Sequence, residues 1–168
     1  MPTLERFTGV LYDALDAPTL PPEARSYLAV GDALFGLVRA DDLIPHYRLS
    51  GSTKLGGRTL KSRWGTAITD ELRALVAAGE FLIDMRSGTY QQLGKLKDAA
   101  TVRVETVQED GSRKVVSHFN KHYKGELARV LALHGEGVSS LKDAASVAQE
   151  AGMSTCLLYT SDAADDSL

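Results

Sequence analysis

Helix-like and strand-like hydrophobic patterns alternate along this chain, and their order most constrains the fold. Residues 60–78 carry apolar side chains every three or four positions, as a helix buried on one face does, and Gly79 follows at the usual C-terminal position. Residues 81–85 and 102–107 instead show the short apolar or alternating patterns of strands. Such alternation is typical of α/β domains, and 168 residues are enough for one domain with its own core.

Weaker patterns predict the remaining elements. They comprise a helix at 23–30, a strand at 47–50 before a loop at 51–57, a hairpin of 102–107 with 113–118, a helix at 120–134 and a last helix from Ser140 to Ala151. The hairpin turns at Asp110-Gly111, and Ser140 with Asp143 resembles a capping box. Residues 31–38 fit either a strand or a helix, because the apolar run is broken by two glycines.

Composition points to the cytoplasm and to no cofactor. No apolar run approaches the roughly 18–20 residues that cross a membrane, and the first residues do not resemble a signal peptide. Cys156 is the only cysteine, which excludes an intramolecular disulfide and a Cys-rich metal site. Because residues 1–155 contain no thiol, they exclude peroxide chemistry at an activated cysteine.

Charge is separated along the chain although the net charge is only -3. Without the three aspartates that follow Cys156, 19 of the 22 acidic side chains remain, equal to the 19 basic ones. Residues 43–69 carry five Lys or Arg and no Asp or Glu, and residues 111–125 carry four, again with no acid. A neutral protein with such segments presents a positive face if folding brings them together.

A positive face of this kind would suit a polyanion. Arg and Lys neutralise phosphates and release counterions, which gives salt-sensitive binding of nucleic acid. Tyr47, Trp64, His122 and Tyr123 lie among these charges and would suit stacking on unpaired bases. The alternatives are an ordinary solvated surface for the basic residues and a core position for Trp64.

Catalytic and metal motifs are incomplete. Residues 51–59 sit between a predicted strand and a helix, as a phosphate-binding P-loop does, but Gly57 occupies the position of the essential Lys. Asp41, Asp42 and Asp84 lack the spacing of an acid–base pair, and Asp42 is better interpreted as a cap or an ion-pair partner of Arg39. His118 and His122 are four residues apart without the intervening Glu of zinc proteases, so no metal site is predicted.

Five short motifs, in the correct order, resemble those of the YaaA-type peroxide-stress proteins. They are Phe7-Thr8-Gly9 ("YTG"), residues 36–49 ("GVLRPLDLMQPYRL"), Trp64-Gly65 ("FWG"), residues 84–90 ("NLASDEY") and residues 117–129 ("SFYAKKARGLMSR"). The resemblance covers about Phe7 to Leu131. Departures occur at Ala40, Asp41, His46, Asp84 and Gln92, which leaves the exact ligand chemistry open.

The resemblance implies a fold and a function. The expected fold is a single α/β domain with a mixed sheet flanked by helices, a helix-hairpin-helix-like element and a positive cleft. The expected function is protection under peroxide stress by binding DNA or another nucleic acid, linked to limiting iron-driven damage, without catalysis. DNA against RNA, and the oligomeric state, stay open. The predicted phosphate contacts are Arg48, Lys54, Lys61, Arg63, Lys121 and Lys124, and the residues expected to shape the cleft are Arg39, Asp42, Tyr47, Ser87 and Tyr90.

A different function class competes with this one. A small-molecule enzyme would use Arg39, Arg48, Ser87 and Tyr90 on an anionic or nucleotide-like substrate in the same cleft. The two classes differ in one property, because binding of nucleic acid through phosphates weakens with salt.

The ends of the chain are expected to differ from the family. Residues 1–155 would be a partial YaaA-like domain that lacks the family's N-terminal part and its extreme C-terminus. Residues 156–168 resemble a translated sequencing adapter rather than an acidic tail.

Overall fold

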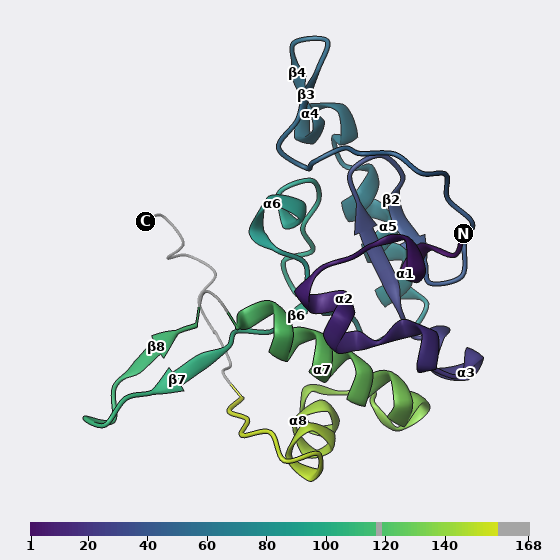
Figure 1. Cartoon of the computed structure of the whole chain (residues 1–168). Coiled ribbons are helices and arrows are strands. Elements are labelled where there is room, and N and C mark those ends of the chain that lie inside the picture. Colours follow the sequence, from purple (N-terminus) through teal and green to yellow (C-terminus); the bar gives the residue numbers. More distant parts are fainter. Residues whose placement is uncertain (117–118, 158–168) are drawn as a thin grey trace.

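Short helices and strands alternate through residues 1–116 and 119–157, the part of the chain that the computed structural model describes (Figure 1). The helices are α1 Thr3–Arg6, α2 Val10–Leu15, η1 Ala17–Thr19, α3 Pro22–Arg25, α4 Leu60–Trp64, α5 Ala67–Ala77, α6 Gly88–Gln91, α7 Asn120–His134, η2 Gly135–Gly137 and α8 Leu141–Glu150. The strands are β1 Ala29–Asp32, β2 Gly36–Arg39, β3 Lys54–Leu55, β4 Arg58–Thr59, β5 Ile83–Asp84, β6 Ala100–Thr101, β7 Glu105–Val107 and β8 Arg113–Val115. Ser117, His118 and residues 158–168 lie outside the described part, and so do the predictions made for them.

The strands pair two by two, which corrects the expected single mixed sheet. Within the described residues, β1–β2, β3–β4 and β7–β8 are antiparallel hairpins, and β5–β6 is a parallel pair. The two strands of each hairpin follow one another along the chain and have only two to four residues. Each strand therefore pairs with its neighbour in sequence, and the hairpins do not join into a larger sheet. The domain is nevertheless α/β, and β5 and β6 are joined through α6 as parallel strands require.

Local hydrogen bonds explain the structure of residues 31–38, which the sequence fitted to either a strand or a helix. The carboxylate of Asp32 accepts hydrogen bonds from the backbone N–H groups of Leu34 (2.7 Å) and Phe35 (2.8 Å). This arrangement is typical of an aspartate at a tight turn, and it ends β1 and sends the chain back as β2. Residues 31–38 are therefore two strands, whereas residues 47–50 form no strand and the prediction there is wrong.

The long helix predicted at residues 60–78 is two helices. Gly65 has a φ of 55°, in the left-handed region that favours glycine, and its N–H bonds to the carbonyl of Lys61 at the end of α4. The chain restarts as α5 at Ala67. By contrast, α7 has the predicted bounds, and α8 begins where Ser140 accepts a hydrogen bond from the N–H of Asp143.

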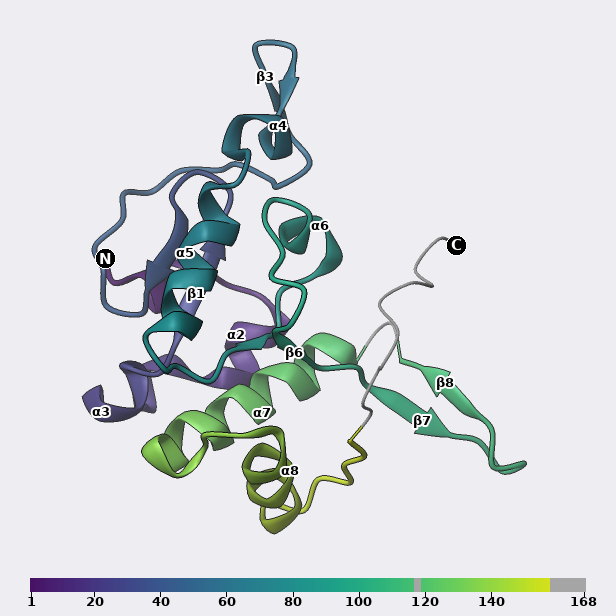
Figure 2. The same cartoon turned by 180° about the vertical axis from the view of Figure 1, so that it is seen from behind.

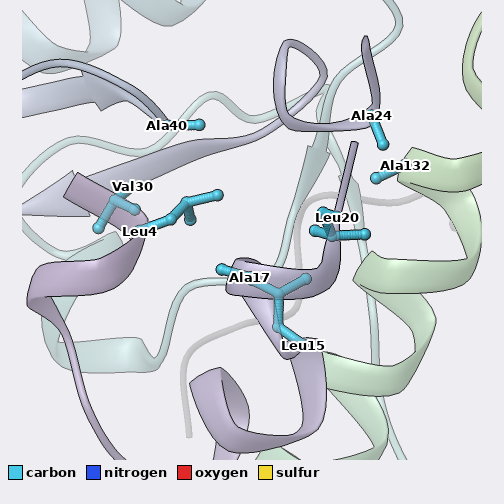
Figure 3. Packing of buried hydrophobic residues seen from close by; sticks show 8 residues of the cluster. All are labelled: Leu4, Leu15, Ala17, Leu20, Ala24, Val30, Ala40 and Ala132. Carbon is cyan, nitrogen blue, oxygen red and sulfur yellow. The ribbon is translucent and has the colours of Figure 1, made fainter. Parts of the chain in front are cut away.

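Two apolar clusters hold the domain together. The first lies between the N-terminal helices, the β1–β2 hairpin and α7, and Figure 3 shows its buried side chains. They are Leu4, Leu15, Ala17, Leu20, Ala24, Val30, Ala40 and Ala132. The second joins Ala33, Leu60, Ile68, Leu72 and Leu93, and so ties α4 and α5 to the segment after α6.

Trp64 belongs to the second cluster and not to a stacking surface. Its Nε1 donates to the carbonyl of Ala33 over 3.0 Å, and its ring lies under Gly36, where an added Cβ would meet the ring at 3.0 Å. This confirms the core alternative for Trp64.

The arrangement in space separates two ends of the molecule. The β3–β4 hairpin and α4 stand at one end, α7 and α8 lie at the other, and α6 lies between them in both views (Figures 1 and 2). The β7–β8 hairpin projects away from the body in both views. In the described residues there is no helix of the length and apolar character needed to cross a membrane.

Candidate functional site

Two carboxylates are among the few buried polar side chains of the described residues. Asp32, at the end of β1, is 2% exposed, and Asp84, at the end of β5, is 7% exposed. Buried carboxylates need compensating donors, so their partners define a polar site within the fold.

Asp32 is satisfied by its own turn and by Tyr47. One carboxylate oxygen accepts the two N–H groups of the β1–β2 turn, and the other accepts a hydrogen bond from the Tyr47 hydroxyl. The Tyr47 ring also meets the ring of Phe35 edge-on, with centroids 5.6 Å apart. These contacts fix the segment after β2 against the turn and make Tyr47 part of the buried site.

Asp84 is satisfied by Arg86 in a two-point ion pair. Arg86 Nε donates to Oδ1 over 2.9 Å and Nη2 donates to Oδ2 over 2.8 Å, with 12% of the Arg86 side chain and 5% of the Asp84 side chain exposed. The guanidinium also donates to the carbonyls of Tyr90 (3.4 Å) and Gly94 (2.7 Å), so it holds the turn around α6. Gly31 makes room for this side chain, because an added Cβ there would lie 2.3 Å from Arg86 Cδ.

Three tyrosines share the environment of Asp32. Burial raises the pKa of Tyr12, and the charges of Tyr90 and Asp32 raise it further. Burial also raises the pKa of Tyr47, followed by the hydrogen bond to Asp32 and then by the charges of Asp32, Tyr90 and Tyr12. Tyr12 and Tyr47 therefore stay protonated well above neutral pH.

Lys124 approaches the same site from α7. The helices α2 and α7 cross at Gly125, where an added Cβ would lie 2.2 Å from the carbonyl oxygen of Leu11. Lys124 and Tyr12 are the chain neighbours of the two residues that meet at this crossing. Burial lowers the pKa of the Lys124 amine, and the charge of Asp84 opposes that effect.

These side chains form one site, which we call the buried polar cluster. It comprises Tyr12, Asp32, Tyr47, Asp84, Arg86, Tyr90 and Lys124, drawn from α2, β1, β5, α6, α7 and the segments that follow β2 and β5. The segment after β2 is further fixed at Gly51, whose added Cβ would lie 3.2 Å from the Thr89 side chain of α6. Tyr12, Tyr47 and Lys124 have shifted pKa values, and titratable groups of this kind gather at functional sites.

Four of the predicted phosphate contacts are exposed, with Lys54 in β3, Lys61 and Arg63 in α4, and Arg48 in the segment between β2 and β3. Arg48, Lys54, Lys61 and Arg63 all have exposed side chains, and no acidic residue is present between residues 43 and 69. Arg63 also donates to the carbonyl of Leu55 through Nε (3.0 Å), which ties the β3–β4 hairpin to α4. We call these four residues the exposed basic group.

The two predicted basic segments are not adjacent. Lys121 is exposed near the start of α7 and Lys124 is half-buried in the polar cluster, whereas β3 and α4, which carry most of the exposed basic group, lie on the other side of α6 (Figures 1 and 2).

A surface pocket of about 450 Å³ lies between α4, α5 and α6, and its lining includes Lys61 and Lys95 but no carboxylate. Residues 85–97 contain no Asp or Glu, a signal that the same count along the sequence would have found.

The other residues expected to shape a cleft do not lie together in the structure. Tyr90 joins the buried polar cluster, whereas Ser87 is exposed at the start of α6. Arg39 is exposed, and its N–H donates to the Asp42 carboxylate over 2.9 Å. The carbonyl of Asp42 accepts from the N–H and the hydroxyl of Thr3, so Asp42 caps a turn and anchors the first helix.

Several sequence signals resolve into structural roles. Residues 51–59 contain the β3–β4 hairpin with Gly56 and Gly57 at its tip, and not a P-loop. Arg129 donates to the carbonyls of Leu15 and Asp16 at the end of α2. His122 lies 3.1 Å from the Glu126 carboxylate one turn along α7. Within residues 1–116 and 119–157, no three His, Cys, Asp or Glu side chains gather in a group that could hold a metal ion.

Three members of the buried polar cluster carried no assignment from the sequence. Tyr12 lies on a helix that the patterns did not predict, and Asp32 lies in the segment that fitted two structures. Arg86 stands inside a motif that carried the resemblance, two residues after Asp84, so its position was a usable signal.

Comparisons with known proteins agree with the motifs. The family model described as "Peroxide stress protein YaaA" matches residues 1–150. A UPF0246 protein of Corynebacterium glutamicum is 61% identical over 158 residues, covering 91% of this chain and 63% of the relative. UPF0246 proteins of Streptomyces coelicolor and Shewanella amazonensis are 40% and 36% identical, covering 85% and 81% of this chain and 58% of each relative.

The chain thus spans less than two thirds of the length of these relatives. The family match nevertheless extends over most of the chain and includes every member of the buried polar cluster. This chain belongs to the YaaA family of peroxide stress proteins.

Proposed function

We propose that this member of the peroxide stress family binds nucleic acid through the exposed basic group. The single observation that carries the proposal is that Arg48, Lys54, Lys61 and Arg63 are exposed in a segment without Asp or Glu, in which Lys61, together with Lys95, lines a pocket without a carboxylate. Such a surface attracts phosphates wherever they lie along a strand and releases their counterions. DNA held there would be shielded under peroxide stress, when iron-driven reactions damage it.

The second basic segment would extend the contact. Lys121 is exposed on α7 and is the fifth predicted contact. The sixth, Lys124, is half-buried and would meet a phosphate only through the exposed part of its side chain. The acid-free stretch of residues 85–97, with Lys95 and Lys97 exposed, lies between the two segments in sequence. The helix-hairpin-helix-like element implied by the resemblance remains part of the proposal.

Titration of labelled single- and double-stranded DNA at low and near-physiological salt tests the proposal. Binding should weaken steeply as the salt concentration rises. The double variant Lys54→Glu with Lys61→Glu should bind with lower affinity. Its slope of log affinity against log salt should also be shallower, by about 1 for each phosphate that is no longer neutralised. Lys142→Glu is the matched control for each single change. It alters the same charge on α8, at the far end of the molecule from the exposed basic group, and Lys142 is likewise exposed (Figure 1).

Two outcomes would contradict the proposal. One is the absence of DNA binding at low salt. The other is an equal loss of affinity in Lys61→Glu and Lys142→Glu, because net charge and not a located surface would then account for binding.

A further inference from the structure

The pocket of about 450 Å³ between α4, α5 and α6 brings together side chains from three separate segments. Its size lies in the range of small-molecule sites, roughly 300–1,000 Å³. Two lysines line it, Lys61 from α4 and Lys95 from the segment after α6, together with Gln91 and Gln92 at the end of α6. Because the lining contains no carboxylate, the lysines make the pocket suited to a ligand with negative charge.

Backbone contacts fix the wall that carries Lys95. An added Cβ at Gly94 would lie 2.6 Å from the Ile68 Cβ, so the segment after α6 packs directly on α5. The carbonyl of Gly94 accepts from Arg86 Nη2 over 2.7 Å, and the carbonyl of Lys95 accepts from the Thr69 hydroxyl of α5 over 3.3 Å. A ligand therefore meets a wall whose backbone is already ordered, which lowers the cost of binding.

The four polar side chains are available to a ligand. Within the described residues, no hydrogen bond or ion pair engages the amines of the two lysines or the amides of the two glutamines. The acidic residue next in sequence to the lining, Asp70, is paired with Arg73 over 2.7 Å. Amines only donate hydrogen bonds, whereas carboxamides both donate and accept them. The pocket thus offers two positive charges to an anion and two amides to an uncharged polar group.

We propose that this pocket binds a nucleotide by its terminal phosphate, with Lys61 and Lys95 at the phosphate and Gln91 and Gln92 at the ribose or the base. A phosphomonoester carries about 1.5–2 negative charges at neutral pH, which two lysines match, whereas a phosphate inside a strand carries one. Amides that donate and accept complement ribose hydroxyls and base edges. A free mononucleotide and the phosphorylated end of a strand share this chemistry.

The nucleotide site rests on the proposed function at one residue, because Lys61 belongs to the exposed basic group and also lines the pocket. The other three side chains lie outside that group. The ligands differ as well. The exposed basic group would contact phosphates at any position along a strand, whereas the pocket would hold one terminal phosphate.

Isothermal titration calorimetry of the whole chain with adenosine monophosphate tests the site. We expect one molecule to bind per chain, and Lys95→Gln should weaken binding about 10-fold, the usual effect of one hydrogen bond to a charged group. Lys142→Gln is the control, because it removes the same charge from an exposed position on α8, and its affinity should be unchanged. Adenosine, which lacks the phosphate, should show no measurable binding.

A second variant tests the amides. The double variant Gln91→Met with Gln92→Met should weaken adenosine monophosphate about 5-fold, the usual effect of one uncharged hydrogen bond, without weakening inorganic phosphate. Two otherwise identical oligonucleotides, with and without a terminal phosphate, distinguish the sources of the ligand. Stronger displacement of adenosine monophosphate by the phosphorylated one identifies a strand end, and equal displacement identifies the free nucleotide.

Duplex DNA titrated into the same chain separates this site from the proposed function. Binding of adenosine monophosphate without binding of duplex DNA would contradict only the proposed function. Four outcomes would overturn the nucleotide site. They are no binding of adenosine monophosphate, equal affinity for adenosine, equal losses in Lys95→Gln and Lys142→Gln, and undiminished binding in the double glutamine variant with a normal far-ultraviolet spectrum.

Discussion

Arg86 holds Asp84 through two hydrogen bonds, 2.9 Å from Nε to Oδ1 and 2.8 Å from Nη2 to Oδ2, and both side chains are almost fully buried. The same guanidinium reaches the carbonyls of Tyr90 and Gly94. One side chain therefore joins the end of β5 to the turn that carries α6. In the interior such a pair is costly to break, because the remaining charge stays buried without a partner.

Arg86→Met should lower the free energy of unfolding by about 3–5 kcal/mol, since it leaves the Asp84 carboxylate unpaired. Urea denaturation followed by circular dichroism measures this. Asp84→Asn in the Arg86→Met background should recover part of the loss. The matched control is Arg73→Met, which breaks the exposed pair with Asp70 and should cost less than about 1 kcal/mol. Equal losses at the two arginines would contradict the structural role of Arg86.

Gly125→Ala should destabilise the domain by about 3 kcal/mol. The added Cβ would lie 2.2 Å from the carbonyl of Leu11 and 2.8 Å from the Ala14 Cβ, so α2 and α7 must move apart. Thermal unfolding monitored by circular dichroism gives the change. Gly88→Ala is the control, because no atom lies within 4 Å of its added Cβ and its φ is not positive. A stable Gly125→Ala variant would show that the two helices do not cross so closely.

Helices and hairpins that are determined by residues close together in sequence were predictable. The helix α7 depends on a continuous amphipathic pattern, and α8 depends on the Ser140 cap, so both have the expected starts. The β7–β8 hairpin follows from a turn at Asp110-Gly111 between two alternating segments. In each case the residues that determine the structure are neighbours in sequence.

Elements that depend on one backbone angle or on distant packing were not predictable in the same way. The apolar period of residues 60–78 continues across Gly65, so only the left-handed φ of that glycine reveals two helices. The site shows the same limit. Counting charges finds exposed lysines, but the buried polar cluster depends on Gly31 and Gly125 admitting close approaches between segments far apart in sequence.

Tyr47→Phe should lower the free energy of unfolding by about 2 kcal/mol at neutral pH, because Asp32 loses its hydroxyl donor. The folded-state pKa of Tyr47 is raised above its ordinary value of 10.0, so the stabilisation is present below that pH and is lost as the pH rises through the raised value. Urea denaturation of both proteins across alkaline pH should show a difference that narrows above 10.0. Tyr123→Phe should change stability by less than about 0.5 kcal/mol.

Ser140→Ala should destabilise α8 by about 1 kcal/mol, since the hydroxyl that accepts from the Asp143 N–H (3.1 Å) is removed. Hydrogen exchange of the first-turn amides of α8 should accelerate more than exchange in α7. Ser146→Ala, at an exposed position inside α8, should cause no loss, because alanine is the better helix former. If the first-turn amides of α8 exchange at the same rate in Ser140→Ala and Ser146→Ala, Ser140 does not cap the helix.

The stability that the Asp143 carboxylate contributes at the start of α8 should be lost at acid pH. Its carboxylate accepts from the Ser140 hydroxyl (2.8 Å) and from the N–H (3.1 Å) and hydroxyl (3.0 Å) of Ser139, and these bonds lower the pKa of Asp143 below its ordinary value of 3.8. A depressed folded-state pKa contributes stability above the ordinary value, and that contribution is lost as the pH falls through the depressed value. The stability difference between the chain and Asp143→Asn should therefore be constant from neutral pH down to about 4 and vanish in stronger acid. A difference that persists in strong acid would show that the three hydrogen bonds do not depend on the ionised carboxylate.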